Sequence, residues 1–167
     1  MQGIEGYHRM MYSTGYISEK EFRPYRKSIS NFINNLDLDS CLKNSIKERL
    51  THSYEYSLQK RLSDSIFSID KCIWELFFST EEEVEQFIQD IKKARNNLTH
   101  PNDQKTTNDS LNCFINYNRI LKVIFMCILF KELGITEEII RDCLLNDGEY
   151  SWFMPNKPER NFELPNI

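Results

Sequence analysis

The stretch STEEEVEQFIQDIKKARNNL, residues 79–98, decides which fold the sequence predicts. Thr80, followed three positions later by Glu83, fits a capping box, so a helix is expected to begin here. Acidic side chains fill the expected first turn. The expected last turn carries basic side chains, namely Lys92, Lys93 and Arg95. This order of charges complements the helix dipole at both ends, and it makes this boundary the best defined in the chain.

Helical spacing of apolar residues continues on both sides of this stretch. It is visible in residues 22–36, 39–50 and 54–78, the last with a break expected near Ser68, and in the strongly apolar segment 110–133. The chain has five Gly and five Pro, and three of the Pro lie in its last 13 residues, which favours long helices over many short strands. The sequence therefore predicts an all-α antiparallel bundle of four or five helices with short extra helices.

The segment before residue 36 carries two competing start signals. Ser18 and Glu21 fit a second capping box, but Pro24 would cost a helix interior about 3 kcal/mol. We therefore expect Pro24 in the first turn and the helix start near Phe22. Aromatic residues make up 13 % of the chain and lie mostly at helical spacing, so most of them are expected in the core.

The two ends of the chain differ from its middle. The start, MQGIEGYHRMMY, has helical spacing without a preceding capping residue, and we expect it to continue from a longer protein, of which this chain would be the C-terminal part. The end, EYSWFMPNKPERNFELPNI, has no clear period, and we expect it to wrap around the surface, anchored by Trp152 and Phe153. The predicted organisation is a helical domain over residues 1–147 and an irregular tail over residues 148–167.

Charge and cysteine content narrow the function classes. The net charge of −4 gives no global attraction to nucleic acid or anionic membranes, so a polyanion site would need a local basic patch. The longest apolar run, VIFMCILF, is far shorter than the roughly 20 residues that a membrane-spanning helix needs, and no secretory signal is visible. The cysteines form no CxxC pair and are interpreted as reduced core thiols of a cytoplasmic protein. They are Cys41, Cys72, Cys113, Cys127 and Cys143.

Metal and cofactor chemistry finds little support in the sequence. Glu5 and His8 have the Glu-x-x-His spacing of di-iron helix bundles, but such a centre needs a second copy of the motif and two more Glu. The nearest pair, Glu48 and His52, has a different spacing. No GxSxG elbow or Gly-rich phosphate loop is present either. We predict neither a metal nor a cofactor.

The segment RNNLTHP, residues 95–101, is the strongest candidate for chemistry. In a structural interpretation, Arg95 satisfies carbonyls at a helix end and His100 is turn material before Pro101. In a functional interpretation, the guanidinium grips a phosphate and the imidazole transfers a proton near neutral pH. Such a pair suffices to cut RNA without a metal, because RNA supplies its own nucleophile in the 2′-OH.

At a helix end in an all-α bundle of this size, RNNLTH resembles the HEPN superfamily, whose ribonuclease members carry Arg-x4-6-His. A polar residue, often Asn, commonly follows the Arg. GIEGYHRMMY near the start and SLQKRLSDSI at residues 57–66 are similar to the first and middle helices of the HEPN domain in ApeA-like anti-phage proteins. The resemblance implies a metal-independent endoribonuclease with Arg95, Asn96 and His100 as the motif residues. A local patch of Lys92, Lys93 and Lys105 beside Arg95 is expected to bind RNA.

The resemblance also implies partners and a cellular role. Members usually act as homodimers with facing motifs, in abortive infection, other phage defence or toxin–antitoxin systems. The expected partners are therefore RNA, a second copy, and either an N-terminal sensor domain of the full-length chain or a separate antitoxin, with no membrane partner. We expect the dimer interface beside residues 92–104, burying part of segment 54–78 or 110–133. The alternative is a non-catalytic helical module for dimerisation or partner binding in a longer defence protein.

Overall fold

The computed structural model describes residues 1–12, 15–99, 108–150 and 154–155, with the backbone alone for 98–99 and 108–114. These residues form helices and no named strand, which confirms the predicted all-α class. The helices are α1 (Gln2–Met11), α2 (Glu19–Asn34), α3 (Ser40–Leu50), α4 (Leu58–Phe67), α5 (Lys71–Trp74), α6 (Glu81–Thr99), α7 (Asn108–Glu132) and α8 (Glu137–Asn146).

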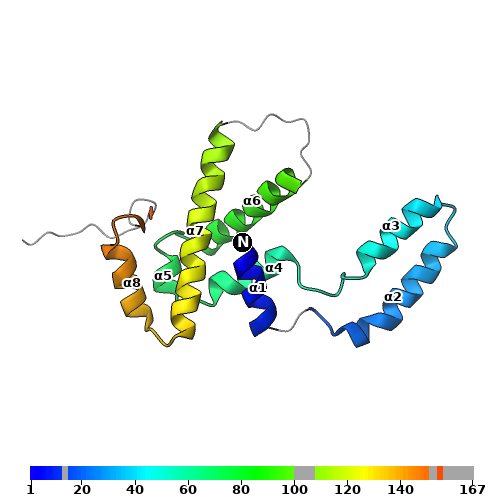
Figure 1. The fold of residues 1–167 in the computed structure, drawn as a ribbon, viewed down its shortest axis with the longest axis horizontal. Coiled ribbons are helices and arrows are strands. Elements are labelled where there is room, and N and C mark those ends of the chain that lie inside the picture. The colour runs from blue at the N-terminus through cyan, green and yellow to red at the C-terminus, as the bar shows by residue number, and fades with distance from the viewer. Residues whose placement is uncertain (13–14, 100–107, 151–153, 156–167) are drawn as a thin grey trace, which may run out of the picture.

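The helices α1 and α4–α8 form the core bundle. Its centre is α4, which contacts α1 on one side and α6 on the other, while α7 contacts α6 and α8. Figure 1 shows α7 crossing α6, with α8 and α5 beside the lower part of α7. The shared core contains aromatic side chains, such as Trp74 and Phe87, and aliphatic side chains that are almost completely buried. The aliphatic residues include Ile4, Leu62, Ile66, Ile73, Val84, Ile88, Ile124, Ile128 and Ile140.

Helix α6 begins where the sequence predicts but ends later. The Thr80 hydroxyl accepts a hydrogen bond from the Glu83 backbone N–H at 3.3 Å, and the Glu83 carboxylate accepts one from the Ser79 N–H at 2.6 Å. The helix then continues to Thr99, so its last turn contains no basic residue. The expectation that Lys92, Lys93 and Arg95 fill the last turn is therefore wrong. Pro101 restricts only the residue before it, and nothing in residues 96–99 stops the helix sooner.

Helix α2 begins earlier than predicted. Both bonds of the capping box are present: Glu21 N–H donates to the Ser18 hydroxyl at 3.2 Å, and Ser18 N–H donates to the Glu21 carboxylate at 2.9 Å. These bonds fix the start at Glu19 and leave Pro24 inside the helix. The expected start near Phe22 is therefore wrong, because two satisfied N–H groups and a pre-set Pro φ offset the one hydrogen bond that Pro24 cannot donate.

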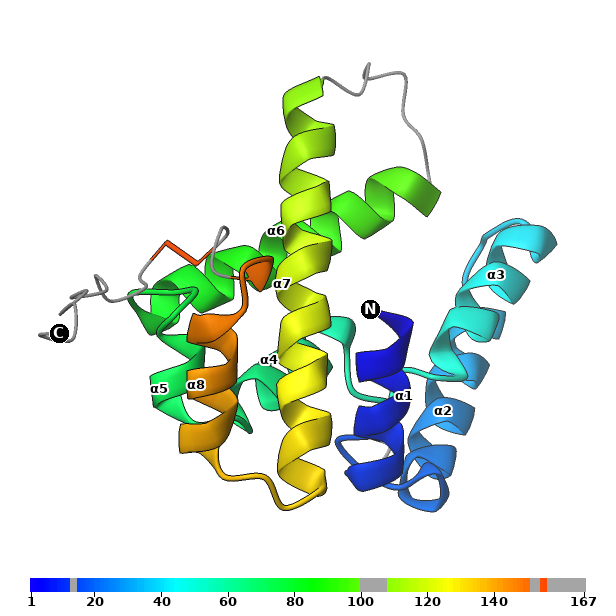
Figure 2. The same cartoon turned by 60° about the vertical axis from the view of Figure 1, so that its left-hand side comes forward.

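Helices α2 and α3 form a hairpin, residues 19–50, that we call the arm. Its two helices pack chiefly against each other, and Figures 1 and 2 both show them extending to the side of the core bundle opposite α8. Ile33 is the single buried residue of α2, and α3 has none. The aromatic side chains of Tyr25 and Phe32 are 62 % and 65 % exposed, so the expectation that such residues lie in the core is wrong for the arm.

A short neck, residues 15–16 and 54–56, joins the arm to the core bundle. Gly15 and Glu55 form an isolated antiparallel bridge, and the Tyr16 N–H donates to the Tyr54 carbonyl at 2.8 Å. A Cβ atom added to Gly15 would lie 2.2 Å from that carbonyl oxygen, so this close backbone approach requires glycine. The ring of Tyr16 packs edge-on against Tyr56. The neck therefore holds the entering and leaving chains side by side.

Two other expectations concern segment 54–78 and the cysteines. The helical structure of this segment is interrupted between Phe67 and Lys71, which confirms the expected break near Ser68.

Cys127 is buried, and desolvation raises the pKa of its thiol to about 12. Cys41 and Cys143, however, lie at the surface, so the interpretation as core thiols is wrong for these two. Among the described helices, none is both long and apolar enough to cross a membrane.

Candidate functional site

Arg95 lies on α6, one turn before the end of the helix, with 40 % of its side chain exposed. Its Nη1 lies 3.2 Å from Oε1 of Glu5, which belongs to α1 and is 18 % exposed. The two helices meet because both pack on α4, and Ile4, next to Glu5, is buried in the shared core. The motif arginine is thus tied to the first helix of its own subunit.

The other predicted site residues fall into two groups. Asn96, Lys92 and Lys93 are exposed on the same stretch of α6 as Arg95. Residues three and four positions apart lie on the same side of a helix, so Lys92 neighbours both Arg95 and Asn96. His100 and Lys105 lie outside the described residues, as do Trp152 and Phe153. The structure therefore brings together four of the six predicted side chains.

Two carboxylates reduce the positive charge at this end of α6. Glu5 pairs with Arg95, and Asp90 Oδ1 lies 3.6 Å from the Lys93 ammonium. Asp90 also accepts hydrogen bonds from Gln86 at 2.9 Å and from the Tyr117 hydroxyl at 3.3 Å, which tie it to α6 and α7. Lys92 shows no such carboxylate partner among the described residues. The net positive charge of the expected basic patch is therefore smaller than its sequence suggests.

The sequence pattern around Glu5 suggested a different partner from the one that Glu5 has in the structure. Its spacing to His8 suggested a metal pair, but the two side chains point to different partners: Glu5 contacts Arg95, and His8 Nε2 lies 3.0 Å from Asp64 Oδ2. Within the described part of the chain, no three His, Cys, Asp or Glu side chains gather closely enough to hold a metal ion. No local signal links Glu5 to Arg95, because 90 positions separate them in sequence.

His8 anchors α1 to α4. The imidazole is fully buried, stacks on Tyr12 with 4.5 Å between ring centroids, and reaches Asp64. The Lys60 ammonium donates to the other Asp64 oxygen at 2.6 Å. Partial burial acts to raise the pKa of Asp64, but the hydrogen bonds from Lys60 and His8 outweigh it and leave that pKa below its usual value. This polar anchor, together with buried Ile4, fixes α1 on the core bundle.

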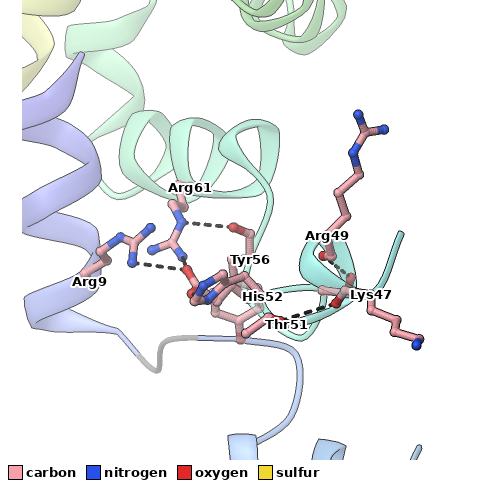
Figure 3. Close-up of polar contacts among 9 residues, drawn as sticks. Arg9, Lys47, Arg49, Thr51, His52, Tyr56 and Arg61 are labelled. Carbon is pink, nitrogen blue, oxygen red and sulfur yellow. Dashed lines mark hydrogen bonds and ion pairs between the residues drawn. The ribbon is translucent and has the colours of Figure 1, made fainter. Parts of the chain in front are cut away.

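A second polar cluster surrounds Glu55 in the neck (Figure 3). Its Oε2 lies 3.1 Å from Arg9 Nη1 and 3.3 Å from Arg61 Nη2, and its Oε1 lies 2.9 Å from His52 Nδ1. Arg61 is almost completely buried and also donates from Nε to the Tyr56 carbonyl at 3.0 Å. One carboxylate therefore connects α1, the neck and α4.

An open pocket of about 720 Å³ lies on a different part of the molecule. Its described walls come from α7, the residues just after α5 and the segment after α8, and none of the lining residues that the structure describes belongs to α6. They combine apolar and polar side chains. The lining residues are Phe77, Asn116, Arg119, Ile120, Glu149, Met154 and Pro155. Among the described residues, the pocket and Arg95 therefore lie on different helices.

Comparison with known protein families matches residues 1–139 to the Apea-like HEPN family. This match covers most of the chain, including both helices that hold Glu5 and Arg95. The chain belongs to the Apea-like HEPN family. A search of curated proteins finds no match, and neither does a search of solved structures.

Proposed function

We propose that the protein is a metal-independent endoribonuclease that cleaves RNA by 2′-OH transesterification, in abortive infection or another phage-defence or toxin–antitoxin setting. The observation that carries the proposal is the partly exposed Arg95 near the end of α6, five positions before His100, in a chain of the HEPN family. Members with this Arg-x4-6-His pattern include ribonucleases, and Asn96 matches the polar residue that follows the motif Arg.

The proposed reaction is one in-line displacement at phosphorus. The 2′-oxygen attacks, the bond to the 5′-oxygen breaks, and the products carry a 2′,3′-cyclic phosphate and a 5′-hydroxyl. His100 takes the 2′-OH proton as general base. Arg95 stabilises the negative charge that grows on the phosphoryl oxygens, because a guanidinium matches two of these oxygens at once. Asn96 keeps Arg95 or the phosphate in register.

Glu5 has a role before the substrate arrives. Its carboxylate holds the Arg95 guanidinium at 3.2 Å, so a phosphate has to compete with it or share it. A guanidinium has five N–H donors, so it can contact a carboxylate and a phosphate together. Lys92, Lys93 and Lys105 supply further positive charge along the RNA backbone.

A homodimer completes the site in this proposal. One imidazole cannot readily reach both the 2′-OH and the leaving oxygen, which lie on opposite sides of the phosphorus. Two-fold symmetry would bring His100 of the partner subunit to the leaving group as general acid. Ile115 supports an interface beside residues 92–104: it is 50 % exposed on α7, two positions from Tyr117, which bonds to Asp90 of α6.

The test is an RNA-cleavage assay in EDTA with wild type, Arg95→Ala and His100→Ala, and with Arg23→Ala as an exposed arginine on the arm. A general acid–base group contributes roughly 10²–10⁴-fold, so His100→Ala is expected to remove at least the lower part of that range. Arg95→Ala is expected to be similarly impaired, and Arg23→Ala to match wild type. Cleavage by His100→Ala at the wild-type rate would refute the proposal. Mixed dimers of Arg95→Ala and His100→Ala subunits, which together hold one intact pair, are expected to recover partial activity.

The second candidate is a non-catalytic module that binds a protein partner. The ion pair of Arg95 with Glu5 in its own subunit and the exposed apolar stripe on α2 favour it. Tyr25, Ile29 and Phe32 form that stripe. Wild-type protein that cuts no RNA, but loses a binding partner on Phe32→Ala, would favour this candidate instead.

A further inference from the structure

Two ion pairs meet on helix α1. Arg95 of α6 pairs with Glu5 at 3.2 Å, and Glu55 of the neck pairs with Arg9 at 3.1 Å. Glu5 and Arg9 are four positions apart in the same helix. The charges therefore alternate from the motif arginine to the neck: Arg95, Glu5, Arg9, Glu55.

A third pairing, between Glu5 and Arg9, is open to the same side chains. Residues at i and i+4 are neighbours on a helix, and a Glu placed N-terminal to a basic residue is the favoured order. The backbone of α1 need not move, because Ile4 and His8 are buried and fix the helix to the core bundle. Only rotation of the two side chains would be required.

We propose that Glu5 exchanges between Arg95 and Arg9, and that the arm controls this exchange through Glu55. The inference rests on the proposed function, in which Arg95 binds the phosphate. The two pairings of Glu5 are in equilibrium: in the molecules in which Glu55 holds Arg9, Glu5 stays on Arg95 and restrains it. When a movement of the arm draws Glu55 away, Arg9 turns to Glu5, and Arg95 loses this one restraint on binding the RNA.

The Glu55 cluster is built so that Arg9 is the partner it loses most easily. Arg61 is almost completely buried, and a buried cation needs its counter-charge, so its contact with Glu55 is the costly one to break. Arg9 is 51 % exposed, and exposed ion pairs contribute little to stability. Glu55 forms the neck bridge with Gly15, which ties the carboxylate to the chain that enters the arm.

The test measures the reactivity of Arg95 directly, by the rate of phenylglyoxal modification followed by mass spectrometry on the full chain. Arg9→Gln removes the alternative partner of Glu5 and is expected to slow modification of Arg95 by about two- to fivefold, the population change that one exposed ion pair supports. Arg9→Lys keeps the charge and is expected to restore the wild-type rate. Arg23→Gln, which removes an exposed arginine paired with Glu19, is the matched control and is expected to have no effect.

The decisive comparison is a double-mutant cycle with Glu5→Gln. This substitution is expected to speed modification of Arg95, and Arg9→Gln added to it is expected to change nothing further. An Arg9→Gln effect that persists without the Glu5 carboxylate would overturn the switch, as would wild-type reactivity in Arg9→Gln itself.

RNA cleavage should follow the same order: Glu5→Gln above wild type, and Arg9→Gln below it. The two proposals fail separately. Loss of the reactivity pattern refutes the switch even if RNA is cut. An intact pattern without any cleavage retains the exchange and refutes the ribonuclease.

Discussion

Helices α2 and α6 begin with the same type of capping interaction, but they differ in how much of their apolar faces is buried. Each starts at a Ser or Thr whose hydroxyl accepts a hydrogen bond from the backbone N–H of a Glu three positions on, and each has apolar residues at helical spacing. Helix α6 buries its apolar face against α4 and α7. The residues concerned are Val84, Phe87, Ile88 and Ile91. Helix α2 buries Ile33 alone and leaves most of its apolar face to solvent.

The difference shows what helical periodicity reports. It reveals that a helix has an apolar face, but it does not reveal what covers that face. Helix α6 packs against helices that precede and follow it in sequence, whereas α2 packs chiefly against α3. Stability should therefore be concentrated in the core bundle, and the arm should respond to mutation as a separate unit.

The largest expected effect is in the core bundle. Leu62 on α4 is completely buried, so Leu62→Ala should lower the free energy of unfolding by about 2–5 kcal/mol, through lost apolar burial and the cavity that remains. Chemical denaturation measures the change. The matched control is Leu42→Ala on α3, where the side chain is 48 % exposed and the cost should be far smaller. Equal costs at the two positions would contradict the separation of arm and core.

The next effect concerns the neck. In Gly15→Ala the new Cβ would lie 2.2 Å from the Tyr54 carbonyl oxygen, so the bridge to Glu55 must open. Overpacking of this kind typically costs about 1–3 kcal/mol. Hydrogen exchange should show faster exchange of the Tyr16 amide, which donates to that carbonyl, with little change in α6. At Gly148 an added Cβ meets nothing within 4 Å, so Gly148→Ala is the control. Unchanged protection at Tyr16 would mean that the neck tolerates a side chain.

Two matched caps give a smaller effect. Ser57 caps α4 and Ser18 caps α2, each by accepting a hydrogen bond from a backbone N–H three positions on. Replacing such a Ser by Ala costs typically about 1 kcal/mol. Ser57→Ala should lower the global unfolding free energy by about that amount, because α4 is central to the core. Ser18→Ala should instead appear as faster hydrogen exchange within α2. A global loss of the same size from Ser18→Ala would show that the arm unfolds together with the core.

The smallest effect is expected at Phe32. Its side chain is 65 % exposed, so Phe32→Ala should change the unfolding free energy by no more than about 0.5 kcal/mol. Thermal unfolding at two protein concentrations, tenfold apart, measures this. A loss of about 2 kcal/mol or more that grows with concentration would show that the stripe is covered in solution by a second copy.

Local signals were enough to predict most of the helices. The capping residues Thr80 and Ser18 mark the starts of α6 and α2. Gly134 follows the end of α7 with a φ of +79°, a backbone conformation that glycine adopts readily after a helix. The errors arose where two local rules conflict or where no local rule applies. At Pro24 the capping box prevailed over the proline, and the sequence of α2 contains nothing to show that its face lacks a partner.

The site was predictable only in part, for a similar reason. Arg95 and Asn96 stand out because their motif is local: Arg95 and His100 are five positions apart in the sequence. Glu5 could not be assigned to Arg95, because their contact depends on how α1 and α6 both pack against α4. The only local pattern around Glu5 pairs it with His8, and each of these two side chains has a different partner in the folded chain.

The neck has a consequence for how this fold can be engineered and how it can diversify. The chain leaves the core bundle at Tyr16 and returns at Tyr54, and the backbone atoms of these two residues are only 2.8 Å apart. A short turn could therefore bridge them directly, and the 37 residues between them form a cassette whose length does not alter the register of α1 or α4. Hairpins of other lengths, or whole domains, could be grafted at this point while the helices that carry Glu5 and Arg95 keep their places.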